Sequence, residues 1–225
     1  MSFTWATLQT EIEAQYDLSE ETFITTTELM VYVNDAIKDV QKSIHTIPGA
    51  DKYYESPGYI ALTSGTSLYS LPTDIYANKI TLLYYNDGST KYEIKPLKDL
   101  REAQLIQTGE WYKYRIENST ASGTKLKLWP ASAETSTTNV IIYYIRKAAT
   151  ITATTDTVDV PEPAREFIKQ YIIDKCANKE RMTPDAPESA ALKREREDLV
   201  SILSSMIVDE NNEVLPDLEH YMDTV

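Results

Sequence analysis

The sequence predicts an α+β protein in which helical ends enclose a β-rich middle. Apolar residues recur at spacings of three and four before residue 50 and after residue 163, which is the period of an amphipathic helix. Between residues 59 and 146 the runs are short, rich in β-branched and aromatic residues, and separated by turn-forming residues. We therefore expect residues 1–50 and 159–208 to form a helical bundle, residues 51–158 an inserted antiparallel, sandwich-like β part, and residues 209–225 a flexible acidic tail.

Two helices are predicted at the N-terminal end. Trp5, Leu8 and Ile12 share one face of a short helix over residues 4–16. Thr25 followed by Glu28 has the pattern of a capping box, which begins a second helix. The apolar face of this helix consists of Leu29, Val33, Ile37, Val40 and Ile44, and the helix ends at Pro48 and Gly49.

The middle of the chain is predicted to be built from short strands. They cover residues 59–63, 67–71, 80–85, 91–94, 111–117, 125–129 and 139–146, with a short helix from Pro96 to Gln107. Asn86, Asp87 and Gly88 tolerate a positive φ, so they predict a hairpin. Residues 140–145 are apolar or aromatic on both faces, which is typical of a strand that is central to a sandwich or covered by a neighbour.

Two further helices and a tail are predicted after Pro163. The first helix has an apolar stripe of Ala164, Phe167, Ile168, Tyr171, Ile172 and Cys176. The second, over residues 188–208, places Leu192, Leu199, Leu203 and Met206 on one face. In the acidic tail, six apolar residues recur at short helical spacings and are interpreted as anchors for a groove elsewhere: Val214, Leu215, Leu218, Tyr221, Met222 and Val225.

The charge of −13 is unevenly distributed along the chain. Residues 1–50 carry 2 basic and 8 acidic groups, residues 51–158 carry 12 and 11, and residues 159–225 carry 8 and 16. Because a basic footprint is missing, we do not expect specific binding of nucleic acid. Neither a signal peptide nor the run of about 20 apolar residues that spans a membrane is found, so we expect synthesis in the cytoplasm and no membrane partner.

The sequence contains few of the motifs that bind nucleotides or metal ions or that form active sites. The six glycines are scattered, and therefore form neither a P-loop nor a dinucleotide fingerprint. Cys176, His45 and His220 are too few and too far apart in sequence for a metal cluster, and Cys176 is expected to be a buried, inert thiol. A pair of catalytic carboxylates is defined by distance in space, and nothing in the sequence favours one. We expect no enzyme activity, no cofactor and no metal.

Tyrosine is the unusual residue, with 16 copies against 3 of phenylalanine. Tyrosine favours half-buried strand faces and interfaces that are wetter than a core. Adjacent pairs such as Tyr84–Tyr85 and Tyr143–Tyr144 present a ring to each face of a strand. These rings either decorate the sheets or form contacts between subunits, and the candidates for a lateral contact are Tyr84, Tyr85, Tyr143, Tyr144 and Ile145.

Several phrases, taken in order, resemble the phage head-to-tail adaptor family, whose members are also called head completion or tail tubular proteins. Asn34-Asp35-Ala36-Ile37 resembles the signature of the family's second helix, and residues 68–74 resemble its Tyr-x-Leu-Pro-x-Asp strand end. Residues 126–130 and 143–147 are similar to two later strands, and residues 160–163 to the entry into the C-terminal helix pair. The resemblance covers about residues 5–205.

The resemblance implies a structural protein of the virion neck rather than an enzyme. Such a protein forms a ring, generally twelve-fold, that docks on the portal, extends the channel for DNA ejection and attaches the tail or nozzle protein. DNA passes through the channel without specific binding, and assembly takes place in the host cytoplasm. The tail anchors would then dock on the portal or on a neighbouring subunit. The residues also leave open a β-rich binding module of a tail or baseplate that recognises another tail protein or a surface glycan.

Overall fold

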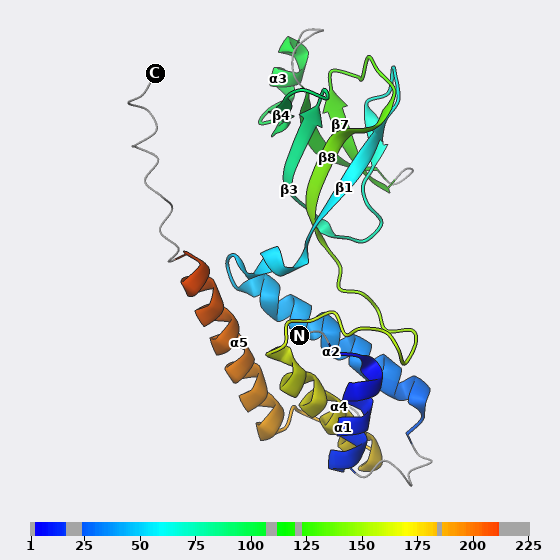
Figure 1. Ribbon diagram of the computed structural model, residues 1–225, viewed down its shortest axis with the longest axis vertical. Helices are drawn as coiled ribbons and strands as arrows, with labels where there is room; N and C mark the ends of the chain where they lie inside the picture. Colours follow the sequence, from blue (N-terminus) through cyan, green and yellow to red (C-terminus); the bar gives the residue numbers. More distant parts are fainter. Residues whose placement is uncertain (1–2, 17–23, 107–111, 120–122, 184–185, 212–225) are drawn as a thin grey trace. The chain divides into compact units, whose positions relative to one another are not determined.

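The computed structural model describes residues 3–16, 24–106, 112–119, 123–183 and 186–211 of the 225-residue chain (Figure 1). The chain divides into two compact units. Residues 1–53 and 148–225 form the first, which we call the helical unit, and residues 54–147 form the second, which we call the β unit.

The helical unit combines the two ends of the chain. Its helices are α1 (Trp5–Tyr16), α2 (Thr26–Thr46), α4 (Ala164–Glu180) and α5 (Ala190–Asn211), and α4 contacts each of the other three. The predicted capping box is confirmed, because the Thr25 hydroxyl accepts from the Glu28 N–H while the Glu28 carboxylate accepts from the Thr25 N–H. The core is formed by the predicted apolar faces, including Trp5, Leu8, Val33, Phe167, Ile168 and Leu199, all at most 1% exposed.

The segment that returns from the β unit is fixed to the helices by its backbone. The Asn34 side-chain oxygen accepts from the Ile151 N–H at 2.8 Å, and its amide nitrogen donates to the Ile151 carbonyl at 3.0 Å. Trp5 and Ala6 donate their N–H groups to the carbonyls of Asp156 and Thr154. Asn34 of α2 therefore satisfies both backbone polar groups of Ile151, in the segment that connects the β unit to α4.

The β unit contains two four-stranded sheets that share a core. The first has the order β1 (Glu55–Leu62), β8 (Ser136–Arg146), β3 (Ile75–Asn86) and β4 (Lys91–Glu93). The second has the order β2 (Leu68–Ser70), β7 (Gly123–Trp129), β6 (Lys113–Ser119) and β5 (Lys95–Pro96). The shared core draws side chains from both sheets, among them Ile60, Tyr69, Leu83, Leu126, Leu128 and Ile142. The α+β class is therefore confirmed.

Strand β8, whose residues 140–145 are apolar or aromatic on both faces, lies in the middle of its sheet. A central position was one of the two predicted alternatives. Figure 1 shows β8 between β1 and β3, and both neighbours run antiparallel to it. The hairpin around Asn86, Asp87 and Gly88 is also confirmed, with Tyr85 opposite Tyr92 and Gly88 at φ +92°. The turn at Gly65, with φ +77°, carries the chain from β1 in the first sheet to β2 in the second.

Several boundaries differ from the prediction, and β1 and β3 begin four and five residues earlier than expected. Pro96 does not begin a helix, because it lies in β5 and pairs in parallel with Tyr114 of β6. Helix α3 (Leu100–Leu105) begins four residues later, after Asp99, whose carboxylate accepts from the Arg101 N–H and supplies the N-terminal cap. Helix α5 continues to Asn211, so Asp209 and Glu210 belong to this helix and not to the tail. None of the helices in the described part of the chain has the length and apolar content that crossing a membrane requires.

Candidate assembly interfaces

The two faces of β8 have different environments. Val140, Ile142 and Tyr144 point into the shared core, and Tyr144 is 6% exposed. The Tyr144 hydroxyl donates to Asp74 at 3.0 Å. Burial, followed by this hydrogen bond to a carboxylate, raises the pKa of Tyr144. Tyr144 therefore has a complete structural role within the β unit.

The opposite face of the first sheet carries a surface of aromatic and aliphatic side chains. Direct pairing places Tyr59, Ile141 and Tyr84 in one row across the sheet, and Pro57, Tyr143 and Leu82 in the next row. Tyr59 is 63% exposed, and the rings of Tyr84 and Tyr143 meet edge to face at 6.4 Å. We call these six residues the aromatic face.

The five candidates for a lateral contact thus divide between the two faces. Tyr84 and Tyr143 belong to the aromatic face. Tyr85 packs against the shared core, with its ring 5.5 Å from that of Tyr112, and burial raises the pKa of Tyr85 to about 12. Tyr144 belongs to the shared core, whereas Ile145 lies on the same side of β8 as Tyr143 but is completely buried. Alternation along a strand puts neighbouring residues on opposite faces, but the sequence does not say which face is covered.

Sequence reasoning missed two members of the aromatic face that the structure makes prominent. Tyr59 and Pro57 lie in β1, whose partner strand β8 follows about eighty residues later in the chain. The available signal for Tyr59 was a tyrosine at the first position of a predicted strand, next to Ile60. The pairing of β1 with β8 is non-local, and no local pattern indicated it.

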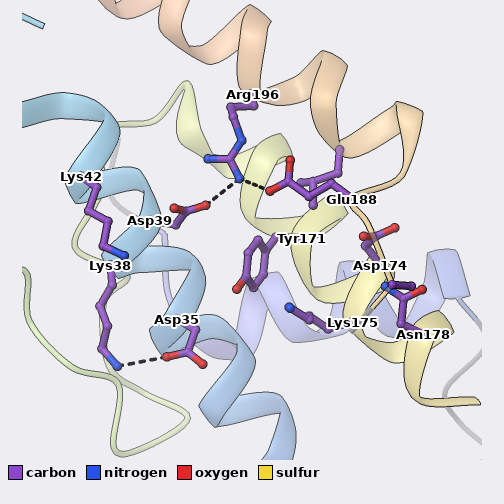
Figure 2. A pocket seen from close by; sticks show the side chains of 12 residues that line it. Asp35, Lys38, Asp39, Lys42, Tyr171, Asp174, Lys175, Asn178, Glu188 and Arg196 are labelled. Atoms are coloured by element: carbon purple, nitrogen blue, oxygen red, sulfur yellow. Dashed lines mark hydrogen bonds and ion pairs between the residues drawn. The ribbon is translucent and has the colours of Figure 1, made fainter. Parts of the chain in front are cut away.

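The helical unit contains a polar hollow of about 350 Å³ lined by α2, α4 and the start of α5 (Figure 2). Arg196 reaches into it from α5 and pairs with both Asp39 of α2, at 2.7 Å, and Glu188. Its guanidinium also lies over the ring of Phe167, 5.0 Å from the centroid. Burial alone would lower the pKa of Arg196, but the hydrogen bonds to the two carboxylates raise it.

Four cationic and four acidic side chains line this hollow, and several of them pair with one another, as Figure 2 shows. Lys38 pairs with Asp35 at 3.0 Å, and the ammonium of Lys175 lies over the ring of Tyr171. Balanced and mutually paired charges hold helices together, whereas a ligand site presents unbalanced groups to its occupant. Arg196 is therefore a tie between α5 and α2.

The other groups with potential chemistry in the described part of the chain are the thiol of Cys176 and the side chains that could bind a metal ion. Cys176 is fully buried, and burial raises the pKa of its thiol to about 12, which keeps it protonated. Within the described ranges, no three His, Cys, Asp or Glu side chains gather closely enough to hold a metal ion. The predicted anchors Val214, Leu215, Leu218, Tyr221, Met222 and Val225, together with His220, lie outside the described residues.

Comparison with known families accounts for nearly the whole chain. Residues 3–212 match the family described as SU10 adaptor protein, and the match includes the helical unit from α1 to α5 and all of the β unit. No curated protein matches the chain. The resemblance noted from the sequence is thereby confirmed, and this chain belongs to the SU10 adaptor protein family, a phage head-to-tail adaptor family whose members are structural proteins of the virion.

Proposed function

We propose that copies of this chain form a ring, twelve-fold as the resemblance to head-to-tail adaptors implies, that docks on the portal in the virion neck. The ring extends the DNA channel and provides the attachment site for the tail or nozzle protein. Membership of the adaptor family supports an interaction with other virion proteins. Two surface properties of the chain support the ring and its channel.

The aromatic face is the observation that carries the proposal. It places six apolar or aromatic side chains together on one side of a sheet whose other side is already buried in the core. Clustered surface aromatics are enriched at the centres of protein interfaces. A lateral contact through this face to a different surface of the next copy is heterologous, and it gives a ring where its rotation closes and a filament where it does not.

The distribution of charge along the chain supports the proposed channel for DNA. Residues 54–147 carry 11 basic and 9 acidic groups, whereas the rest of the chain, which is the helical unit, carries 11 basic and 26 acidic groups. We propose that acidic helices line much of the channel, since a wall that repels phosphate lets DNA pass without being held. A ring structure with a channel lined mainly by Lys and Arg would contradict this part.

The proposal is tested by measuring the mass of the purified chain alone and after mixing with its portal. We expect a closed oligomer of defined mass on the portal, and subunits in lateral contact when the complex is imaged by cryo-electron microscopy. Isolated copies bound to the portal without mutual contact would refute the ring.

A further inference from the structure

The outer face of the second sheet concentrates positive charge in a chain whose total charge is −13. Direct pairing places Lys127 beside Arg115, Lys125 beside Glu117, and Lys113 beside both Trp129 and Lys95. The alternate residues of the same strands, such as Tyr69, Leu126 and Leu128, point into the shared core. We call Lys95, Lys113, Arg115, Lys125 and Lys127 the basic face.

The cations of the basic face are accessible and partly held in position. Lys95 and Arg115 are exposed. Lys127 pairs with Glu117 at 3.2 Å and lies 4.7 Å from the ring of Trp129, and Lys125 donates to the Ser70 hydroxyl at 2.9 Å. The neighbouring side chain of Leu68 is 46% exposed. The face therefore offers cations beside apolar and aromatic surface.

A hollow of about 420 Å³ adjoins this face at β5. Lys95 and Lys113 line it together with Lys91, Glu93, Tyr92 and Tyr112. Tyr112 is held in place, because its hydroxyl contacts that of Ser132 at 3.2 Å and its ring meets that of Tyr85. Two tyrosine rings surrounded by lysines suit an apolar or aromatic anchor that is followed or preceded by carboxylates.

The chemistry of the face favours a peptide over DNA. Glu117 lies within the face and Glu102 pairs with Lys113, so carboxylates already alternate with the cations and would repel a continuous row of phosphates. The charge of the whole chain also opposes a polyanion at long range. A peptide whose carboxylates are separated by apolar side chains carries fewer and less closely spaced negative charges than DNA, so both kinds of repulsion are weaker for it.

The chain itself contains such a sequence. Residues 212–225 carry four acidic side chains, Glu213, Asp217, Glu219 and Asp223, and no Lys or Arg. The six apolar anchors lie between and around these carboxylates. With Glu117 and Glu102 set against its five cations, the basic face keeps a net charge of +3, opposite in sign to the −4 of the side chains of residues 212–225.

We propose that the basic face and its adjoining hollow form the receptor for residues 212–225 of a second copy of this chain. The carboxylates pair with the lysines and Arg115, and an anchor such as Leu218 or Tyr221 enters the hollow between Tyr92 and Tyr112. The inference rests on the proposed function, in that the ring brings the C-terminal segment of one copy to the β unit of another. Partial exposure of the cations makes each pair worth little alone, and affinity comes from several pairs plus the apolar anchor.

The test is direct binding of a fluorescent peptide of residues 212–225 to the chain ended at Asn211, which keeps every residue that the structure describes. We expect saturable binding that weakens about tenfold or more in Lys95→Glu/Arg115→Glu and also weakens as salt rises from low to high concentration. The control, Lys79→Glu/Lys147→Glu, makes the same change of charge at two exposed lysines of the β unit outside the basic face. It is expected to bind within about twofold of the parent, and both variants are checked for an unchanged melting temperature.

Three outcomes overturn the proposal. The first is an absence of binding, the second is equal binding of a peptide with the same composition in scrambled order, and the third is a duplex DNA that binds more tightly than the peptide and displaces it. A Leu218→Ala/Tyr221→Ala peptide that binds as well as the parent would remove the anchor from the proposal and overturn the role of the hollow. The assay needs neither ring nor portal, so its failure is distinguishable from failure of the ring, which the mass measurement reports independently.

Discussion

Glu28 links two ends of the chain through a single carboxylate. It completes the cap of α2 and pairs with Lys179 near the end of α4 at 2.6 Å. The hydrogen bond from Lys179, followed by that from the Thr25 backbone, lowers the pKa of Glu28 from 4.5 to about 2. The folded pKa lies below the unfolded one, so this carboxylate stabilises the fold fully above pH 4.5, and the contribution is lost as the pH falls towards 2.

Glu28→Gln is therefore expected to lower the melting temperature at neutral pH. The deficit should shrink as the pH falls from 4.5 and vanish near pH 2, where the parent is protonated as well. Glu197→Gln on the exposed side of α5 removes the same charge and serves as the control, with little effect at any pH. A deficit for Glu28→Gln that is constant down to pH 2 would contradict the linkage.

Tyr143 and Tyr144 are adjacent, yet the structure assigns them different consequences. Tyr143→Lys places an ammonium on the aromatic face, so we expect weaker self-association with little loss of monomer stability. Tyr144→Lys buries an ammonium in the shared core and is expected to cost about 3 kcal/mol or more. Monomer melting and oligomer mass, measured on both variants, separate the two effects. Equal loss of folding in both variants would show that Tyr143 is also a core residue.

At the scale of elements, α5 is fastened to α2 by Arg196. Arg196→Ala removes two charge-assisted hydrogen bonds and the contact with Phe167, and is expected to lower the free energy of unfolding by about 1–2 kcal/mol, since the group is partly exposed. Arg194 of the same helix, 81% exposed and 3.8 Å from Asp198, is the matched control. Arg194→Ala should change stability by less than about 0.5 kcal/mol in urea unfolding. Similar losses in both would mean that the Arg196 pairs contribute nothing.

The elements differ in how well the sequence predicts them, for a physical reason. The capping box at Thr25 and the hairpin at Asn86 to Gly88 involve residues within a few positions of one another, and both are confirmed. The assignment of β1 and β2 to different sheets, and the place of β8 beside β1, depend on pairs far apart in sequence. Local patterns define a strand and its two faces, but tertiary packing decides which face is buried.

The same limit applies to the candidate interfaces. The tyrosine pairs were visible in the sequence, and pairing then placed Tyr84 and Tyr143 outside and Tyr144 inside. The basic face had a signal as well, because Lys113 and Arg115, like Lys125 and Lys127, are two residues apart in predicted strands. A count of charge over residues 51–158 averages this pattern to near zero. Charge counted by strand face, rather than by segment, would have found it.

At the scale of the whole molecule, the two units divide charge between them, and this division predicts how ionic strength affects assembly. An acidic helical unit and a β unit with a basic face attract each other between copies, while the excess of negative charge keeps copies apart at long range. The proposed lateral contact through the aromatic face is apolar and should resist salt, whereas the proposed docking of residues 212–225 is largely ionic and should be screened. Assembly is therefore expected to have a salt-sensitive and a salt-resistant component.

Removal of residues 212–225 separates these components. The deletion takes nothing from the described helices and strands, so the melting temperature of the monomer should change by no more than about 1–2 °C. Ring formation and portal attachment should weaken sharply at low salt, and what remains should no longer weaken as salt rises. A chain in which the last fourteen residues are replaced by a Gly/Ser sequence of equal length serves as the control for length and is expected to behave like the deletion. Deleted chains that complete particles as well as the parent would show that this segment has no part in assembly.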